Sequence, residues 1–114
     1  MRKPGMLGAL AALSGAVAVI AGAFGAHGAA GKAAEWLHTG AQYQMIHAIA
    51  ALVALGFPRG RGAAILFVGG GALFAGTLYA MAFGGPKWLG AITPLGGVAM
   101  IVGWLVLAVV VSRR

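Results

Sequence analysis

The sequence predicts an all-α, polytopic membrane protein folded as a bundle of four transmembrane helices. The main observation is the distribution of charge, because no Asp, Glu, Lys or Arg occurs in residues 4–31, 36–58, 62–86 and 88–112. A transmembrane helix needs about 17–25 mostly apolar residues, since about 30 Å of hydrocarbon is crossed at about 1.5 Å per residue. Each of the four uncharged stretches is therefore long enough to cross a bilayer.

The composition supports the same fold class. The chain is 61% hydrophobic and 8% charged, with a mean hydropathy of +0.97, whereas soluble domains are about half apolar and about a quarter charged. The connecting segments are too short to fold alone, so residues 1–114 form a single domain. The chain has no cysteine, which excludes disulfides, thiolate catalysis and cysteine-ligated metals.

The first span is predicted over residues 5–26. Pro4 suits the first turn of a helix, where its missing N–H has no intrahelical partner in any case. A signal peptide is the competing interpretation, because Arg2 and Lys3 form a charged start and residues 21–23 (AGA) resemble a cleavage site. The apolar stretch is longer than the usual 7–15 residues of a signal peptide, which favours a retained helix.

The second span is predicted over residues 40–57. Residues 33–39 are expected to form an amphipathic lead-in at the interface, with Trp36 as an aromatic anchor and with Glu35 and His38 facing headgroups or water. Pro58 and Gly60 end the span, and Arg59 and Arg61 make the following turn basic.

The third and fourth spans are predicted over residues 63–83 and 88–111. The turn between them is Gly84-Gly85-Pro86-Lys87, and Trp88 is an interfacial anchor at the start of the fourth span. Pro94 lies one to two turns into this span, so a kink or a broken first turn is expected there.

Positive charge sets the predicted orientation. Four crossings place six cationic residues on one side of the membrane, namely Arg2, Lys3, Arg59, Arg61, Arg113 and Arg114. Lys32, Lys87 and Glu35 fall on the other side. The more positive side is cytoplasmic for short loops, which predicts a multi-pass protein of the bacterial inner membrane with both termini in the cytoplasm. The net charge of +7 is thus assigned to topology and headgroup contact, and nucleic acid is not an expected partner.

Small residues recur at helical spacing within three of the predicted spans. They are Gly8, Ala12, Gly15, Ala18 and Gly22 in the first, Gly69, Ala72, Gly76 and Ala80 in the third, and Gly96 and Gly103 in the fourth. Small residues let helix backbones approach closely in a membrane. Packing within the molecule is the expected use of these rows, and a homo-oligomer interface or a groove for lipid or another subunit is the alternative.

His47 is the ionisable residue predicted to lie deepest in the membrane. It is about 15 Å from the end of the second span, counted back from Phe57 at about 1.5 Å per residue. Tyr43 and Gln44 share its helical face, and Thr77 and Thr93 are candidate partners from neighbouring spans. This predicted polar cluster is either a neutral, hydrogen-bonded structural element or a proton-relay or ligand-binding site.

The remaining polar residues give little basis for catalysis. His27, Glu35 and His38 lie at the outer interface, and their spacing matches no zinc motif. His27 and His47 differ in depth by about half the membrane, which argues against a shared haem. The glycine runs lack the context of a phosphate loop, and neither Ser14 nor Ser112 is near a base. No enzymatic activity, metal or cofactor is predicted.

Four motifs resemble those of one membrane-protein family. They are residues 22–28 (GAFGAHG), 43–48 (YQMIHA), 76–79 (GTLY) and 88–97 (WLGAITPLGG). In this order they are similar to the family catalogued as domain of unknown function 423, the YgdD-like small inner-membrane proteins. This chain departs from the family by a shorter polar stretch after His27. The resemblance implies a four-helix inner-membrane protein and implies no activity, and it points to Tyr79 beside the residues named above.

Three functions are compatible with these features. The first is a non-enzymatic accessory or scaffold component that binds other membrane subunits or further copies of itself. The second is a small oligomeric transporter or channel that uses His47, although Glu35, the only acid, lies outside the predicted crossing. The third is a lipid- or quinone-binding module with glycine-lined grooves and the aromatic residues Trp88 and Trp104.

Overall fold

The protein is a bundle of four long α-helices. A computed structural model describes residues 5–113, which form α1 (Gly5–His27), α2 (Gly31–Leu55), α3 (Arg61–Ala82), the short 3₁₀ helix η1 (Lys87–Ala91) and α4 (Thr93–Ser112). The predicted anchors Arg2, Lys3 and Arg114 lie outside the described residues.

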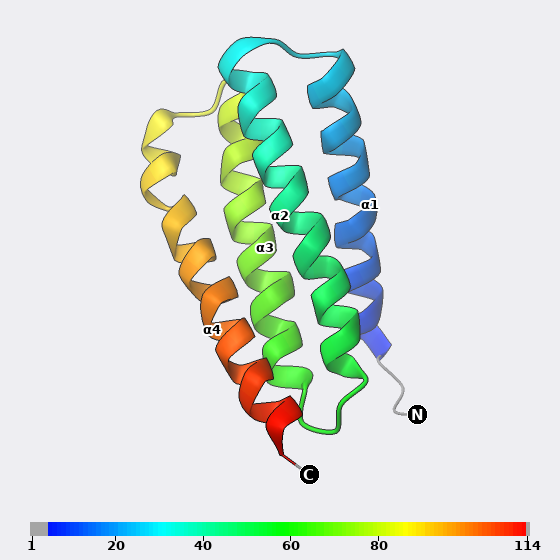
Figure 1. Cartoon of the computed structure of the whole chain (residues 1–114). Coiled ribbons are helices and arrows are strands. Elements are labelled where there is room, and N and C mark those ends of the chain that lie inside the picture. Colours follow the sequence, from blue (N-terminus) through cyan, green and yellow to red (C-terminus); the bar gives the residue numbers. More distant parts are fainter. Residues whose placement is uncertain (1–4, 114) are drawn as a thin grey trace.

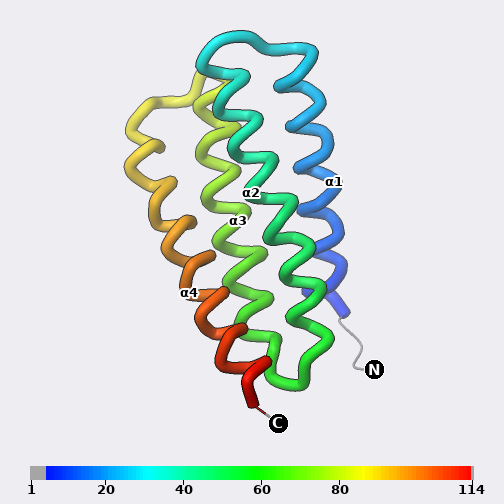
Figure 2. The backbone as a smooth tube through the Cα atoms, in the orientation of Figure 1, coloured from blue at the N-terminus to red at the C-terminus, as the bar shows by residue number. Residues whose placement is uncertain are grey.

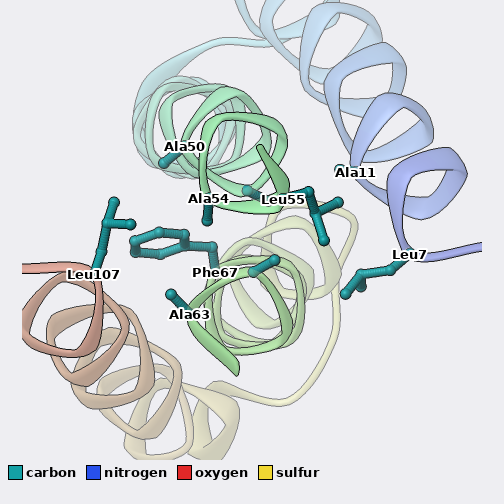
Figure 3. Packing of buried hydrophobic residues seen from close by; sticks show 10 residues of the cluster. Leu7, Ala11, Ala50, Ala54, Leu55, Ala63, Phe67 and Leu107 are labelled. Carbon is teal, nitrogen blue, oxygen red and sulfur yellow. The ribbon is translucent and has the colours of Figure 1, made fainter. Parts of the chain in front are cut away.

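The helices run up and down, so that α1 begins and α4 ends at the same end of the bundle (Figures 1 and 2). The central pair is α2 and α3, with α1 packed mainly on α2 and α4 packed mainly on α3. Viewed end-on, α1 and α4 lie on opposite sides of this pair (Figure 3). The molecule measures 47 × 24 × 19 Å, and its long axis is close to the about 40–45 Å of a bilayer with its headgroups.

Three segments are long and apolar enough to cross a membrane, namely Gly5–His27, Arg61–Ala82 and Lys87–Ser112. The helix α2 is not among them, because its polar residues continue beyond Lys32 and Glu35 to Gln44 and His47. The expected lead-in over residues 33–39 and the expected crossing over 40–57 form one continuous helix, which ends at Leu55. At about 1.5 Å per residue its 25 residues span about 37 Å, more than the hydrocarbon thickness.

The start of α4 is broken, as Pro94 predicts. The 3₁₀ helix η1 ends at Ala91, and α4 begins at Thr93 with Pro94 in its first turn. Proline fits this position because the first N–H groups of a helix have no intrahelical acceptor.

The main hydrophobic core lies at the end of the bundle where α1 begins and α4 ends. Its centre is the ring of Phe67, which is fully buried and surrounded mostly by alanines of α2 and α3 (Figure 3). Leu7 of α1 and Leu107 of α4 close it on opposite sides (Figure 3). A smaller cluster of Ala21, Leu37 and Ala41 joins α1 to α2 at the opposite end.

The small-residue rows differ in whether they pack against a neighbouring helix. On α1, Gly15 and Gly22 face α2: an added Cβ at Gly22 would lie 3.5 Å from the Cβ of Ala41. Ala12, however, is exposed, and Ala11 is the buried alanine of that turn. On α4, Gly96 and Gly103 are buried against α3.

The row on α3 is not packed within the molecule, and the expectation of internal packing is wrong there. Gly69, Ala72, Gly76 and Ala80 are all exposed. An added Cβ at Gly69 or Gly76 would meet nothing within 4 Å. The inner face of α3 carries a second small-residue row, which includes Ala64, Gly70, Gly71 and Ala75.

Candidate functional site

The polar side chains inside the bundle form three hydrogen bonds between helices. The buried polar residues of the described part of the chain are Gln44, His47, Thr77 and Thr93. Their contacts join α2 to α3, α3 to α4 and α4 to α2, once each. Over residues 5–113, no buried side-chain nitrogen or oxygen lacks a partner. The three bonds thus tie α2, α3 and α4 together, whereas α1 is held by close apolar packing.

His47 is hydrogen-bonded through both ring nitrogens. Its Nδ1 lies 2.6 Å from the backbone oxygen of Tyr43, and the indole N–H of Trp104 donates to its Nε2 at 3.0 Å. A carbonyl oxygen can only accept and an indole N–H can only donate. Nδ1 must therefore carry the proton and Nε2 must be bare, so both partners select the same neutral tautomer.

Aromatic rings surround His47. The ring of Trp104 stands edge-on to it with centroids 5.8 Å apart, and that of Phe67 lies 5.6 Å away. The ring of Tyr43 is nearly parallel to the imidazole, with an interplanar angle of 7° at 6.2 Å. The sole acidic side chain of the chain, Glu35, pairs with Lys32 near the start of α2, 12 residues before His47.

Thr77 and Thr93 form a separate pair and do not contact His47. Their hydroxyl oxygens are 2.6 Å apart, and the hydroxyls also lie close to the backbone oxygens of Phe74 and Leu89, respectively. Gly71 of α3 lies beside His47, since its added Cβ would lie 3.7 Å from the histidine Cβ. Thr77 is six residues further along, or about 9 Å at 1.5 Å per residue.

Gln44 pairs with Tyr79, whose hydroxyl donates to Oε1 of Gln44 at 2.7 Å. Gly40 makes room for this tyrosine, because an added Cβ at Gly40 would lie 2.7 Å from Cε1 of the ring. The five residues that were predicted to form one cluster therefore belong to three separate contacts. Tyr79 and Trp104, which the predicted cluster did not include, are the partners of Gln44 and His47.

Depth along the helices is a signal that makes Trp104 a candidate partner of His47, whereas the placement of α4 beside α2 comes only from the tertiary structure. His47 lies eight residues before the end of α2, and Trp104 lies eight residues before the end of α4. Both are thus about 12 Å from the same end of the bundle at 1.5 Å per residue. An indole N–H inside a membrane requires an acceptor, and His47 is the buried acceptor at that level.

Two hollows lie beside this contact, between α2 and α4. One has a volume of about 410 Å³ and is lined by Tyr43, His47, Phe74 and Trp104 together with apolar residues of α4. The second has a volume of about 290 Å³ and is lined by residues such as Ile49, Val53 and Leu107, and it shares Trp104 with the first. Both are open and strongly apolar, as a contact surface for lipid would be.

The other predicted site residues lie at the ends of the helices. His27 ends α1 and is exposed, as are His38 and Glu35 on α2. Lys32 and Glu35 form an exposed ion pair at 3.8 Å, which contributes about 0–1 kcal/mol. In residues 5–113, no three His, Asp or Glu side chains come together in a way that would hold a metal.

The predicted anchors also lie at helix ends. Trp88 in η1 is exposed and Trp36 is half-buried on α2. Arg59 lies in the α2–α3 turn, Arg61 is the first residue of α3 and Arg113 follows α4. These three arginines therefore lie at the end of the bundle opposite Trp36 and Trp88.

Comparison with known proteins identifies related membrane proteins. A family model described as "Protein of unknown function (DUF423)" matches residues 21–97. The UPF0382 membrane protein of Haemophilus influenzae is 44% identical over 82 residues, which are 68% of this chain and 66% of that protein. No solved structure matches the chain.

Two further relatives are similar over comparable lengths of the chain. The UPF0382 membrane protein YwdK of Bacillus subtilis is 41% identical, covering 63% of this chain and 64% of its own. The UPF0382 inner membrane protein YgdD of Escherichia coli is 34% identical, covering 65% and 61%. The chain thus spans slightly less than two thirds of the length of these relatives.

Proposed function

The chain belongs to the DUF423 family of membrane proteins, and from this premise we propose that it is a non-enzymatic accessory or scaffold component of a larger assembly in the inner membrane. In this proposal the chain crosses the membrane four times, with both termini in the cytoplasm.

Four crossings are supported by the arrangement of the helices. The helix α2 packs along both α1 and α3, each of which is long and apolar enough to span the membrane. It therefore traverses the same thickness as they do. The described arginines at the end of the bundle where α1 begins and α4 ends favour a cytoplasmic location for that end.

A non-catalytic role rests on the hydrogen bonding of His47. Its nitrogens are occupied by Trp104 and by the backbone of Tyr43. A general base needs a free nitrogen within reach of the proton that it abstracts. The bonds of the other buried polar residues likewise join helices, so the polar groups of the bundle contribute to its assembly.

The accessory role is supported by the outer face of α3. Its exposed glycines and alanines present backbone to the surroundings without a partner in this chain. Small residues on a membrane helix allow close approach of another helix. A subunit helix, or a second copy of this chain, would pack there in the proposed assembly.

The experiment is native mass spectrometry of the protein, extracted gently from its own membranes. Co-migration with larger membrane proteins is the expected result and would identify the assembly. A clean monomer would contradict the accessory role, and a homo-oligomer would leave self-association as the role of the α3 face.

A lipid- or quinone-binding module is the second candidate, favoured by the apolar hollows between α2 and α4. A transporter that protonates His47 has less support, because a proton on Nε2 would break the hydrogen bond from Trp104. The variant His47→Ala distinguishes a transport role of His47 from a structural one. Transport would be lost if His47 takes part in it, whereas only the stability of the protein would fall if His47 is structural.

A further inference from the structure

Three hollows lie between α4 and either α2 or the turn that follows α2. The first two are those beside Trp104, of about 410 Å³ and 290 Å³. The third has a volume of about 490 Å³ and is lined by Phe57, Pro58, Arg59, Val110 and Arg113. We name this series of hollows the α2–α4 seam. Ala50 and Leu107, which line the second hollow, belong to the same core cluster as Phe67 of α3 (Figure 3).

The seam is apolar over most of its length and cationic at one end. Ile46, Ile49, Val53 and Leu107 line its middle, whereas both charged residues that line the third hollow are arginines. No acidic side chain of this chain lies beside them, because the only one, Glu35, pairs with Lys32 near the opposite end of the bundle. An anion from outside the chain is therefore the expected counter-charge.

We propose that the α2–α4 seam binds one anionic phospholipid, with its phosphate between Arg59 and Arg113 and an acyl chain along α2 and α4. Guanidinium groups bind phosphate oxygens through paired, charge-assisted hydrogen bonds. The cytoplasmic leaflet, where the proposed topology puts this end, carries the anionic headgroups that attract basic residues at a membrane surface.

The length of the seam fits an acyl chain. From Tyr43 to Leu55, where α2 ends, the seam covers 12 residues, or about 18 Å at 1.5 Å per residue, and Phe57 follows in the turn. One leaflet contributes about half of the about 30 Å of hydrocarbon, so a chain that starts at the arginines reaches the level of His47 and Trp104. The apolar middle of the seam favours a lipid over free phosphate, which would use the arginines alone.

This inference deepens the second candidate function by naming its ligand class, and it is independent of the accessory role. The test is titration of the purified, delipidated protein in detergent with phosphatidylglycerol, with phosphatidylcholine and with inorganic phosphate, followed by native mass spectrometry. One phosphatidylglycerol is expected to bind per chain, with clear preference over phosphatidylcholine and with no competition from millimolar phosphate.

Arginine variants test whether the lipid binds at the third hollow or is attracted by positive charge in general. Arg59→Gln and Arg113→Gln are each expected to weaken phosphatidylglycerol binding by about tenfold, the effect of losing one charge-assisted hydrogen bond. Arg61→Gln is the matched control, because Arg61 is exposed at the same end but does not line the hollow. An equal loss in all three variants would indicate diffuse attraction to charge and would overturn the proposal.

The groove is tested by a second pair of variants. Ile49→Trp fills the middle of the seam and is expected to reduce binding, whereas Leu52→Trp, exposed elsewhere on α2, is expected to leave it unchanged. Thermal unfolding without lipid checks that each variant is folded. Equal affinity for phosphatidylcholine, displacement by inorganic phosphate, or retention of a quinone instead would each overturn the phospholipid assignment. None of these outcomes would contradict the accessory role, which is tested separately by the co-migration of subunits.

Discussion

In the proposed topology, the contact of His47 with Trp104 joins two helices at a depth where no water is available. Each group alone would be an unsatisfied polar atom in hydrocarbon, and together they satisfy one another. Because the backbone of Tyr43 binds the other imidazole nitrogen, the histidine ring is held in one tautomer and one orientation. His47 therefore stabilises the contact between α2 and α4 through Nε2, the same nitrogen that a proton relay would need.

A double-mutant cycle measures this contact. Trp104→Phe removes the indole N–H and His47→Phe removes its acceptor, so each single variant is expected to be less stable than the wild type. The coupling energy is expected to be about 0.6–1.7 kcal/mol, the range for side-chain hydrogen bonds in membrane proteins. Unfolding in mixed micelles supplies the free energies.

Trp88→Phe is the control for this cycle, because Trp88 is exposed in η1. Its coupling with His47→Phe is expected to be zero. A zero coupling for Trp104 as well would mean that the hydrogen bond adds no stability.

At the scale of helices, the backbones of α3 and α4 lie against one another where Gly70 and Gly96 meet. An added Cβ at Gly96 would lie 2.7 Å from the backbone oxygen of Gly70 and 2.5 Å from the backbone nitrogen of Phe74. Backbone atoms cannot move aside as a flexible side chain can. The packing of α4 on α3 therefore depends on this glycine.

Gly96→Ala is expected to destabilise the protein, since overpacking of about 1–3 kcal/mol exceeds the gain in helix propensity of about 1 kcal/mol. Gly97→Ala is the matched control on the next residue, where the added Cβ lies 3.9 Å from the ring of Phe74 in ordinary contact. That variant is expected to be as stable as the wild type or more stable. Equal losses of unfolding free energy in both would contradict close backbone packing at Gly96.

The outer face of α3 gives the corresponding prediction for assembly. Gly76→Leu adds a side chain where nothing lies within 4 Å, so the isolated protein is expected to keep its stability. If a subunit packs on this face, the variant loses co-migration in native mass spectrometry. Ala12→Leu, exposed on α1, is the control that should retain the partner, and retention in both variants would remove this face from the assembly.

At the scale of the whole molecule, the alternating helices and the described arginines support a topology with both ends inside. Single cysteines test it, because the chain has none of its own. Ala30→Cys, between α1 and α2, is expected to react with an impermeant maleimide from the periplasm. Pro58→Cys, in the α2–α3 turn, is expected to react only after the membrane is permeabilised.

Ile49→Cys, on the lipid-facing side of α2, is the unreactive control. Labelling of Pro58→Cys in intact cells would show that α2 does not cross the membrane as proposed.

The sequence by itself determined the helical class, the order of the four helices, the break near Pro94 and the positions of the charges. It also indicated His47 and Gln44 as buried polar residues. These features follow from local chemistry, because charge, proline and glycine act on the backbone or on contact with water wherever the helices lie. The bounds of α2 were harder to predict from the sequence, since its polar first turns continue directly into its apolar part.

Only the tertiary structure decided which small-residue row of α3 faces inward, that Trp104 and Tyr79 are the polar partners, and that a seam runs between α2 and α4 to two arginines. The physical reason is that lipid tails and a helix interior are equally apolar. In a soluble protein, hydropathy separates the buried face of a helix from the exposed one. In a membrane both faces carry the same residues, so the packing partner of each side chain depends on the arrangement of helices that are distant in sequence.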